Sequence, residues 1–350
     1  MSGPFRVATT ADFTGPDGNC RYRDIGLDRL EAVDGIDHAP LSEHISPIPA
    51  AQLAGVNALL SLTPHVVTDS LNQADDLLAI ARFGVGYDWI DVDACTAHDV
   101  LLTITAGAVD RPVAEATVTW MLALSHRLLA KDRLVREARW DDRAGFMGSE
   151  LRDRRLGIIG CGGIARGLLS LLRSFGMGTP LACDPFLKGE QAAELGVERV
   201  ELDELLRQAD FVSVHCPLTE QTRNLIGARE LALMQPHAYL INTARGGIVD
   251  EEALYQALVD GRIAGAGIDC FVDEPITTPP RLAELDQVLL APHCIAWTDE
   301  LFRDIGRMAC TSIVDLAQGR RPHGVVNPAV LEKPSFQEKW RRLALQAVQA

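Results

Sequence analysis

Three ionisable residues follow the ends of apolar runs: Arg245 after "LINT", Glu274 within "GIDCFVDEP" and His293 after "VLLAP". An arginine guanidinium holds a carboxylate through two parallel hydrogen bonds and stays charged at any working pH. A histidine that is held by a carboxylate donates and accepts the proton of a carbonyl–alcohol pair. Together these residue types would suit a 2-hydroxy acid, provided that a nicotinamide gives or takes the hydride.

Each of the three residues also has an ordinary explanation. Taken singly, Arg245 is as consistent with a structural arginine paired to a nearby acid. His293 alone would suit a buried core histidine, and Glu274 alone a surface loop acid. The functional interpretation depends on their shared position, because the carboxyl ends of parallel strands face the ligand crevice of an open α/β sheet.

The segments around these residues alternate between short apolar runs and stretches of helical periodicity. We expect strands at 154–160, 180–184, 210–216, 238–243, 264–269 and 287–293. We expect helices at 164–176, 201–209, 228–235 and 250–261, preceded by one long helical stretch over 112–140. Continuously apolar strands separated by helices indicate a parallel sheet that is covered on both faces, and right-handed crossovers make it doubly wound.

The stretch "GIIGCGGIARGLL" joins the first of these strands to its helix through a glycine motif. Gly160, Gly162 and Ala165 match G-x-G-x-x-G/A, in which the first glycine permits a tight turn and the second lets a pyrophosphate approach the helix N-terminus. The triplet alone is weak, but the motif requires a strand before it and a helix after it, and both are expected here. Asp184 ends the next strand, where a carboxylate would bind the ribose hydroxyls and repel a 2′-phosphate. The pattern favours NAD over NADP, with an ordinary loop aspartate as the alternative.

The composition fits a globular chain of two domains. Of the 350 residues, 47% are hydrophobic and 23% are charged, and the net charge is −15. This acidity disfavours a broad nucleic-acid surface, which needs a basic face. The first residues lack the features of a secretory signal, no apolar run reaches the ~18 residues of a membrane span, and the eight cysteines form no CxxC pair. We therefore expect a cytoplasmic protein without a disulfide framework, a bound metal, a membrane or a nucleic-acid partner.

Six stretches, taken in order, resemble the D-isomer-specific 2-hydroxy acid dehydrogenase family: "GIIGCGGIA", "HCPLTEQTRNLI", "LINTARGGIVDEEAL", "GAGIDCFVDEP", "LAPHC" and "VVNPAVL". The resemblance runs from about Val56 to Leu331. It implies a two-domain α/β enzyme with a Rossmann-type doubly wound parallel sheet for NAD and a smaller flavodoxin-like α/β substrate (lid) domain. It places the lid in residues 1–105 and 298–350 and the NAD-binding domain in 106–297, with the active cleft between the lobes and a homodimer built through the nucleotide lobes.

The resemblance also gives roles to particular residues. Arg245 becomes the arginine that binds the substrate and polarises its carbonyl, His293 the general acid and base, and Glu274 the carboxylate that holds His293. The stretch "FGVGYDWID" resembles the loop whose backbone amides, around Val85 and Gly86, bind the substrate carboxylate. The residues expected to bind NAD are Gly160, Cys161, Gly162, Gly163, Ile164, Asp184, His215, Cys216, Pro217, Thr222, Thr243, Ala244 and Asp269.

The sequence departs from the family pattern in two places. After His293 it reads "CIAWT", where the family is small and glycine- or serine-rich, so Trp297 either lines the substrate pocket or packs against the final helix. Asp110 and Arg111 precede "VAE" without an assigned role. These departures leave the 2-hydroxy/2-oxo acid substrate open, with reduction of glyoxylate or hydroxypyruvate as the leading expectation. The alternatives are an NAD(H)-sensing, corepressor-like binding protein and a dehydrogenase of a non-carboxylate anion such as phosphite.

Overall fold

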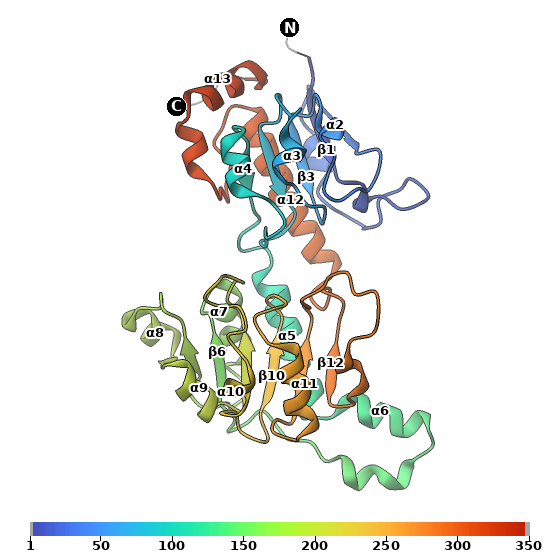
Figure 1. Ribbon diagram of the computed structural model, residues 1–350, viewed down its shortest axis with the longest axis vertical. Coiled ribbons are helices and arrows are strands. Elements are labelled where there is room, and N and C mark those ends of the chain that lie inside the picture. Colours follow the sequence, from blue (N-terminus) through green and yellow to red (C-terminus); the bar gives the residue numbers. More distant parts are fainter. Residues whose placement is uncertain (1–2, 347–350) are drawn as a thin grey trace. The chain divides into compact units, whose positions relative to one another are not determined.

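The computed structural model describes residues 3–346 and divides the chain into two compact units (Figure 1). The first unit comprises Met1–Val109 and Trp297–Ala350, and the second comprises Asp110–Ala296. The division predicted from the sequence, after residues 105 and 297, differs from these bounds by a few residues.

The second unit contains a seven-stranded sheet in which all neighbouring strands are parallel. Its strand order is β12-β11-β10-β9-β6-β7-β8. The strands are β6 (Leu156–Ile159), β7 (Leu181–Cys183), β8 (Glu198–Arg199), β9 (Phe211–Val214), β10 (Tyr239–Asn242), β11 (Gly265–Ile268) and β12 (Val288–Leu290). The chain runs outward from β6 to β8 and then resumes at β9 on the other side of β6. This reversal is the switch point of a Rossmann-type fold, beside which ligands bind.

Helices cover this sheet because their apolar faces are buried against continuously apolar strands. They are α5 (Asp110–Ser125), α7 (Gly163–Leu172), α8 (Gly189–Leu195), α9 (Leu202–Gln208), α10 (Ala228–Leu231), α11 (Glu251–Val259) and η3 (Arg281–Glu284). Two further helices of this unit, α6 (Leu128–Arg136) and η2 (Trp140–Phe146), extend away from the sheet (Figure 1). Gly267 lets α5 approach closely, since a Cβ there would lie 2.6 Å from the ring of Trp120. Asp250 caps α11 by accepting a hydrogen bond from the N–H of Ala253.

The long helix predicted over 112–140 is wrong, because the structure contains two helices there. The carbonyl of Ser125 accepts a hydrogen bond from the N–H of Ser149 (2.8 Å), so it is engaged outside the helix. Arg127 then takes a left-handed conformation with φ 53°, which ends the first helix before α6 begins. Helical periodicity extends across this break and could not reveal it.

The first unit contains a five-stranded parallel sheet of order β2-β1-β3-β4-β5, the flavodoxin-like arrangement. Its strands are β1 (Phe5–Thr9), β2 (Ile36–Pro40), β3 (Ala58–Ser61), β4 (Ala79–Arg82) and β5 (Leu101–Thr103). Its helices are η1 (Ala11–Phe13), α1 (Asp28–Glu31), α2 (Ala50–Leu53), α3 (Thr68–Leu71), α4 (Val92–Ala97), α12 (Asp299–Ala317), η4 (Pro328–Glu332) and α13 (Pro334–Leu343). The segment after the second unit thus belongs to the first unit.

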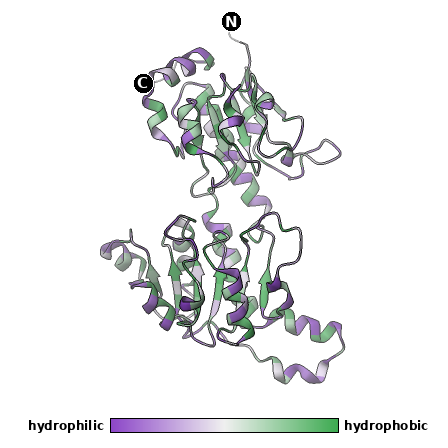
Figure 2. Ribbon diagram, viewed as in Figure 1, coloured by the Kyte–Doolittle hydropathy of each residue, from purple (hydrophilic) through white to green (hydrophobic). Residues whose placement is uncertain are grey.

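Hydrophobic residues are concentrated on the strands of each unit (Figure 2), and the buried hydrophobic residues form its core. The strands β3, β6, β9 and β11 are buried along their whole length, as expected of parallel strands covered on both faces. Within residues 3–346, no helix combines the length and the apolar character needed to cross a membrane.

Candidate active site

The glycine loop after β6 packs directly on the backbone that follows β9. Gly160 has φ +89°, and a Cβ at this position would lie 2.7 Å from the backbone nitrogen of Cys216, so the turn requires glycine. A Cβ on Gly162, the N-cap of α7, would meet no atom within 4 Å. The N-terminus of this ten-residue helix is therefore open to an anionic group at the switch point of the sheet.

Asp184 lies beside this loop, directly after β7. Its Oδ2 accepts a hydrogen bond from the N–H of Cys161 (2.7 Å), and its Oδ1 accepts one from the N–H of Phe186 (2.7 Å). A carboxylate has about four acceptor sites, so two bonds fix its orientation and leave capacity for ligand hydroxyls. The carboxylate is thus held beside the glycine loop, and binding of the ribose hydroxyls by Asp184 stays a prediction.

Two predicted cofactor residues carry buried polar atoms without a partner among the described residues. They are His215, through Nδ1, and Thr243, through Oγ1, at the ends of the adjacent strands β9 and β10. The other ring nitrogen of His215 pairs with Ser213 Oγ at 2.8 Å, and burial lowers the pKa of this histidine to about 4, so the ring is neutral at neutral pH. Buried polar atoms normally have partners. Unpaired atoms beside a glycine loop fit a ligand with polar groups, such as a dinucleotide.

Other predicted cofactor residues are two cysteines affected by burial and residues whose hydrogen bonds fix the turns after β9 and β10. The thiol of Cys161 is buried in the core, and burial raises its pKa. Burial also raises the pKa of Cys216, to about 11. Thr222 donates from its hydroxyl to the carbonyl of Pro217 at 2.7 Å, which closes the turn after β9. The N–H of Ala244 donates to Asn242 Oδ1 at 3.1 Å.

Asp110, for which the sequence suggests no role, lies against the glycine loop. A Cβ on Gly163 would stand 1.9 Å from Asp110 Oδ2, so the carboxylate occupies the space above the first residue of α7. Burial raises the pKa of this carboxyl above its ordinary value. The adjacent charges on α5, Arg111 and Glu115, pair with each other, and Arg166 lies one turn along α7. An acid thus stands next to the predicted pyrophosphate position.

Arg245 is half-buried in the turn that follows β10. Its Nη1 donates to the carbonyl of Ala244 at 2.7 Å. The amide of Asn242 donates to the carbonyl of Arg245 at 2.9 Å and so fixes the turn. Gly246 permits the close approach of the next strand end, because a Cβ there would lie 1.9 Å from the carbonyl oxygen of Phe271. The arginine therefore stands on a rigid turn beside the segment that carries Glu274.

His293 and Glu274 form a hydrogen-bonded pair. The Nδ1 of His293 lies 2.7 Å from Oε2 of Glu274, and Oε1 of Glu274 accepts the N–H of Phe271 at 2.8 Å. Burial opposes ionisation of Glu274, but the hydrogen bonds from His293 and Phe271, aided by the charges of His293 and Arg245, lower the pKa of Glu274 below its ordinary value. The carboxylate is therefore ionised at neutral pH and holds the ring of His293 through this hydrogen bond. The structure thus brings Arg245, Glu274 and His293 into one electrostatic group.

Asp269, predicted as a cofactor residue, holds the turn that carries His293. Its Oδ1 accepts hydrogen bonds from the N–H groups of Cys294 (2.9 Å) and Ile295 (3.2 Å), and its carbonyl accepts the N–H of His293 (2.8 Å). Burial raises the pKa of the carboxyl. The backbone of His293 has φ 53°, so these bonds hold the histidine in a conformation that few residues adopt. Sequence spacing gives no signal for this contact.

The predicted substrate residues Val85, Gly86 and Trp297 belong to the first unit. Among residues 3–346, the N–H groups of Val85 and Gly86 find no acceptor, whereas the carbonyl of Gly86 accepts Arg82 Nε at 2.6 Å. Two adjacent unpaired N–H groups suit an anion. The ring of Trp297 packs edge-on against Tyr22, at a centroid distance of 5.8 Å, and against Phe302 of α12, at 5.0 Å. These contacts fit the alternative in which Trp297 packs against a helix of the first unit. About half of Trp297 remains exposed.

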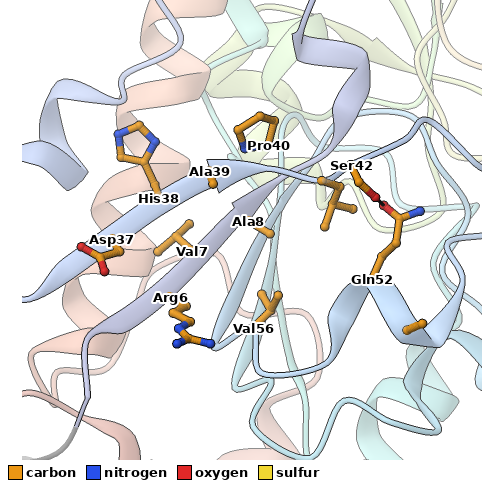
Figure 3. A pocket seen from close by; sticks show the side chains of 12 residues that line it. Arg6, Val7, Ala8, Asp37, His38, Ala39, Pro40, Ser42, Gln52 and Val56 are labelled. Atoms are coloured by element: carbon orange, nitrogen blue, oxygen red, sulfur yellow. Dashed lines mark hydrogen bonds between the residues drawn. The ribbon is translucent and has the colours of Figure 1, made fainter. Parts of the chain in front are cut away.

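The first unit also contains a hollow that is lined by other residues. Its cavity volume is about 490 Å³, and its lining comes from β1, β2 and the α2 region (Figure 3). Asp37 and His38 of β2 line it, and His38 pairs with Glu31 at 3.2 Å. Its lining includes no predicted catalytic or cofactor residue, so we assign no chemistry to it.

Comparison with known proteins now identifies the class. Residues 118–294 match the family described as D-isomer specific 2-hydroxyacid dehydrogenase, NAD binding domain. A glyoxylate reductase of Korarchaeum cryptofilum is 36% identical over 307 residues, which are 86% of this chain and 91% of that protein. A D-3-phosphoglycerate dehydrogenase of Methanocaldococcus jannaschii is 38% identical over 75% of this chain and 50% of its own length. The structure of a D-lactate dehydrogenase from Aquifex aeolicus with NAD and lactic acid matches with a TM-score of 0.77 at 27% identity, over 88% of this chain and 94% of that one.

The chain belongs to the D-isomer specific 2-hydroxyacid dehydrogenases. It is an NAD-dependent oxidoreductase that interconverts a 2-hydroxy acid and its 2-oxo acid. The predicted family, fold class, reaction and cofactor are confirmed. The open helix N-terminus and the unpaired atoms of His215 and Thr243 fit NAD as the group bound at the second unit.

Proposed function

We propose that Arg245, Glu274 and His293 form the catalytic site and that the enzyme reduces small 2-oxo acids, with glyoxylate and hydroxypyruvate as the preferred substrates. The observation that carries the proposal is the 2.7 Å pair of His293 and Glu274 beside Arg245, at the carboxyl edge of the sheet that carries the glycine loop. An arginine, a carboxylate and a histidine at one edge supply a substrate anchor and an acid–base pair.

Each residue has a separate task in the reductive direction. The guanidinium of Arg245 binds the substrate carboxylate and draws electron density from the adjacent carbonyl. His293 keeps its Nδ1–H on Glu274, and its Nε2–H gives a proton to the carbonyl oxygen as that oxygen becomes an alcohol. Bound NADH supplies the hydride that C2 receives. Holding the substrate in this orientation supplies about 7–11 kcal/mol of the barrier reduction in well-aligned cases.

The N–H groups of Val85 and Gly86 stay a prediction for the substrate carboxylate. Their lack of acceptors among the described residues supports an anion-binding role. Trp297 and its neighbour Tyr22 stand as candidates to limit the size of the substrate side chain, because aromatic rings that pack together form a rigid wall.

Asp184 sets the preference for NADH over NADPH in this proposal. The Asp184→Ser variant removes the negative charge that faces the ribose, so we expect NADPH efficiency to rise and NADH efficiency to fall, by about tenfold each. Parallel measurements of kcat/KM with both cofactors check this. Asp203→Ser, on helix α9, is the matched acidic control. An unchanged ratio in Asp184→Ser would remove this residue from ribose recognition.

Asp110 weakens cofactor binding in this proposal, because its carboxylate faces the pyrophosphate position. Asp110→Asn should bind NADH several-fold tighter at neutral pH, with a gain that shrinks as the pH falls into the acid range. The sign follows from the raised pKa: as the pH falls, Asp110 is neutralised early, so binding to the wild type tightens toward acid pH. Fluorescence titrations across this range check the prediction. Identical pH dependence in both proteins would contradict it.

The substrate class is tested by NADH oxidation against glyoxylate, hydroxypyruvate, pyruvate, a branched 2-oxo acid and an aromatic 2-oxo acid. We expect the highest kcat/KM for glyoxylate or hydroxypyruvate, as the names of similar proteins suggest. A preference for a branched or aromatic acid would refute this substrate assignment. NADH binding without turnover would favour a sensor, and NAD reduction by phosphite would favour the non-carboxylate alternative.

We also propose a homodimer built through the second unit. Its α6 and η2 extend away from the sheet (Figure 1). The segment 128–147, which contains both helices, carries exposed large apolar side chains, namely Leu128, Leu129, Val135, Trp140 and Met147. A group of exposed apolar side chains favours a protein partner. Sedimentation of the wild type and of a Trp140→Glu variant tests the dimer, which the added charge should dissociate.

The eight free cysteines favour a reducing compartment such as the cytoplasm.

A further inference from the structure

We propose that Cys270, Glu274 and His293 form a zinc site through which Zn²⁺ reversibly inhibits the enzyme. Among residues 3–346, these three side chains are the one group of potential ligands close enough to hold a metal ion, with all ligand atoms within 4.8 Å of one another. Cys270 and Glu274 lie after β11, and His293 lies after β12. The inhibition rests on the proposed catalytic roles, whereas the binding of zinc does not.

The geometry needs only a small adjustment to hold the ion: the Glu274–His293 pair must open slightly, and the thiol must approach both. The Glu274 and His293 atoms are already 2.7 Å apart, and the thiol of buried Cys270 donates to the carbonyl of Ala244 at 3.4 Å. Ligand atoms of tetrahedral zinc are separated by roughly 3.4–3.6 Å, given metal–ligand bonds of about 2.0–2.3 Å. Rotation about the side-chain bonds of Glu274 and His293, whose side chains are 34% and 36% exposed, supplies the adjustment.

The donor set selects zinc among the common divalent ions. A thiolate, an imidazole and a carboxylate suit Zn²⁺, whereas Mg²⁺ and Ca²⁺ prefer oxygen ligands alone. Three protein ligands leave one tetrahedral position for water or for a substrate oxygen. On binding, the Cys270 thiol releases its proton to solvent, and the neutral imidazole of His293 donates a ring lone pair to the ion.

Zinc at this position would stop the proposed proton transfer. A ring nitrogen that binds the ion carries no proton, and the carboxylate of Glu274 no longer holds the imidazolium. NADH binding should continue, because the glycine loop and Asp184 lie at other strand ends. The sequence offers no sign of this site, since its ligands follow two different strands and lack the short spacing of zinc motifs.

The test uses the whole enzyme, stripped with chelator and titrated with Zn²⁺ by calorimetry, in parallel with rates of NADH-dependent 2-oxo acid reduction. The variants are Cys270→Val and Cys270→Ser, with Cys294→Ser as the control that removes a neighbouring thiol outside the cluster. We expect one Zn²⁺ per chain on the wild type and on Cys294→Ser. The Cys270 variants should bind it at least about tenfold more weakly and should retain their activity in zinc. Excess EDTA should restore the inhibited wild type.

Zinc binding and inhibition are distinguished by separate measurements. A Co²⁺ titration with a thiolate charge-transfer band in the wild type, absent from both Cys270 variants, supports the site without any activity measurement. Equal zinc affinity in Cys270→Val and the wild type, or no binding to either, would overturn the proposal. Zinc binding through Cys270 without loss of turnover would overturn the inhibition. A metal-free wild type that reduces no 2-oxo acid would instead refute the proposed function and leave the site intact.

Discussion

The His293→Ala variant is expected to lower kcat for 2-oxo acid reduction by about 10²–10⁴-fold, because it removes the group that gives the proton to the carbonyl oxygen. His293 stands 2.7 Å from Glu274 and is fixed by backbone bonds to Asp269. The dissociation constant for NADH should stay near that of the wild type. Stopped-flow reduction and NADH fluorescence titration measure the two quantities separately.

Two further variants sharpen this prediction. Glu274→Gln keeps a side chain that can hydrogen-bond to His293 but removes the charge, so its kcat should fall between those of the wild type and His293→Ala. Cys294→Ser changes the neighbouring residue and should have little effect. If His293→Ala turns over as fast as Cys294→Ser, another group supplies the proton and the acid–base assignment fails.

The Arg245→Ala variant should lose kcat/KM for the 2-oxo acid with little change in NADH affinity. Removing one partner of a hydrogen-bonded charge pair costs about 2–5 kcal/mol, which is roughly a 30-fold to 4,000-fold loss. The turn that carries the arginine is held by Asn242, and Gly246 packs against Phe271. The backbone of the site should therefore survive the substitution, and steady-state kinetics measures the loss.

Arg245→Lys is the matched variant, because it keeps the charge and loses the two parallel hydrogen bonds. We expect it to recover part of the loss. The pKa of Glu274 is lowered in part by Arg245, so the alanine variant should also shift the acid limb of the pH–rate profile upward. Wild-type efficiency in Arg245→Ala would exclude the arginine from substrate binding.

Much of the second unit could be predicted from the sequence, because its strands are apolar on both faces and its helices are amphipathic. Each strand from β6 to β12 lies within a predicted range, except β8, whose two residues Glu198 and Arg199 are exposed and polar. In the first unit, the apolar stretches "VNALLSL" and "DLLAIARFG" contain β3 and β4 and are typical of buried strands. The edge strand β2 has one buried residue, Ile36, followed by polar or partly exposed positions, so periodicity could not mark it.

The candidate site likewise has residues that the sequence predicts and residues that only the structure reveals. Glycine spacing and strand ends pointed to Gly160, Asp184 and the three ionisable residues. The roles of Asp110 and Asp269 depend on contacts between segments far apart in the chain, with Gly163 and with the turn at Cys294. Such contacts are set by helix packing and by backbone hydrogen bonds, and residue spacing carries no record of them.

The most direct test of the proposed reaction follows deuterium from NADH deuterated at both C4 positions into the product of hydroxypyruvate reduction. We expect one deuterium at C2 of the product, since the hydride adds to a carbonyl held by Arg245 and His293. We expect the D configuration at that carbon because the family is D-isomer specific. Product without deuterium at C2, or product of the L configuration, would contradict the proposed reaction.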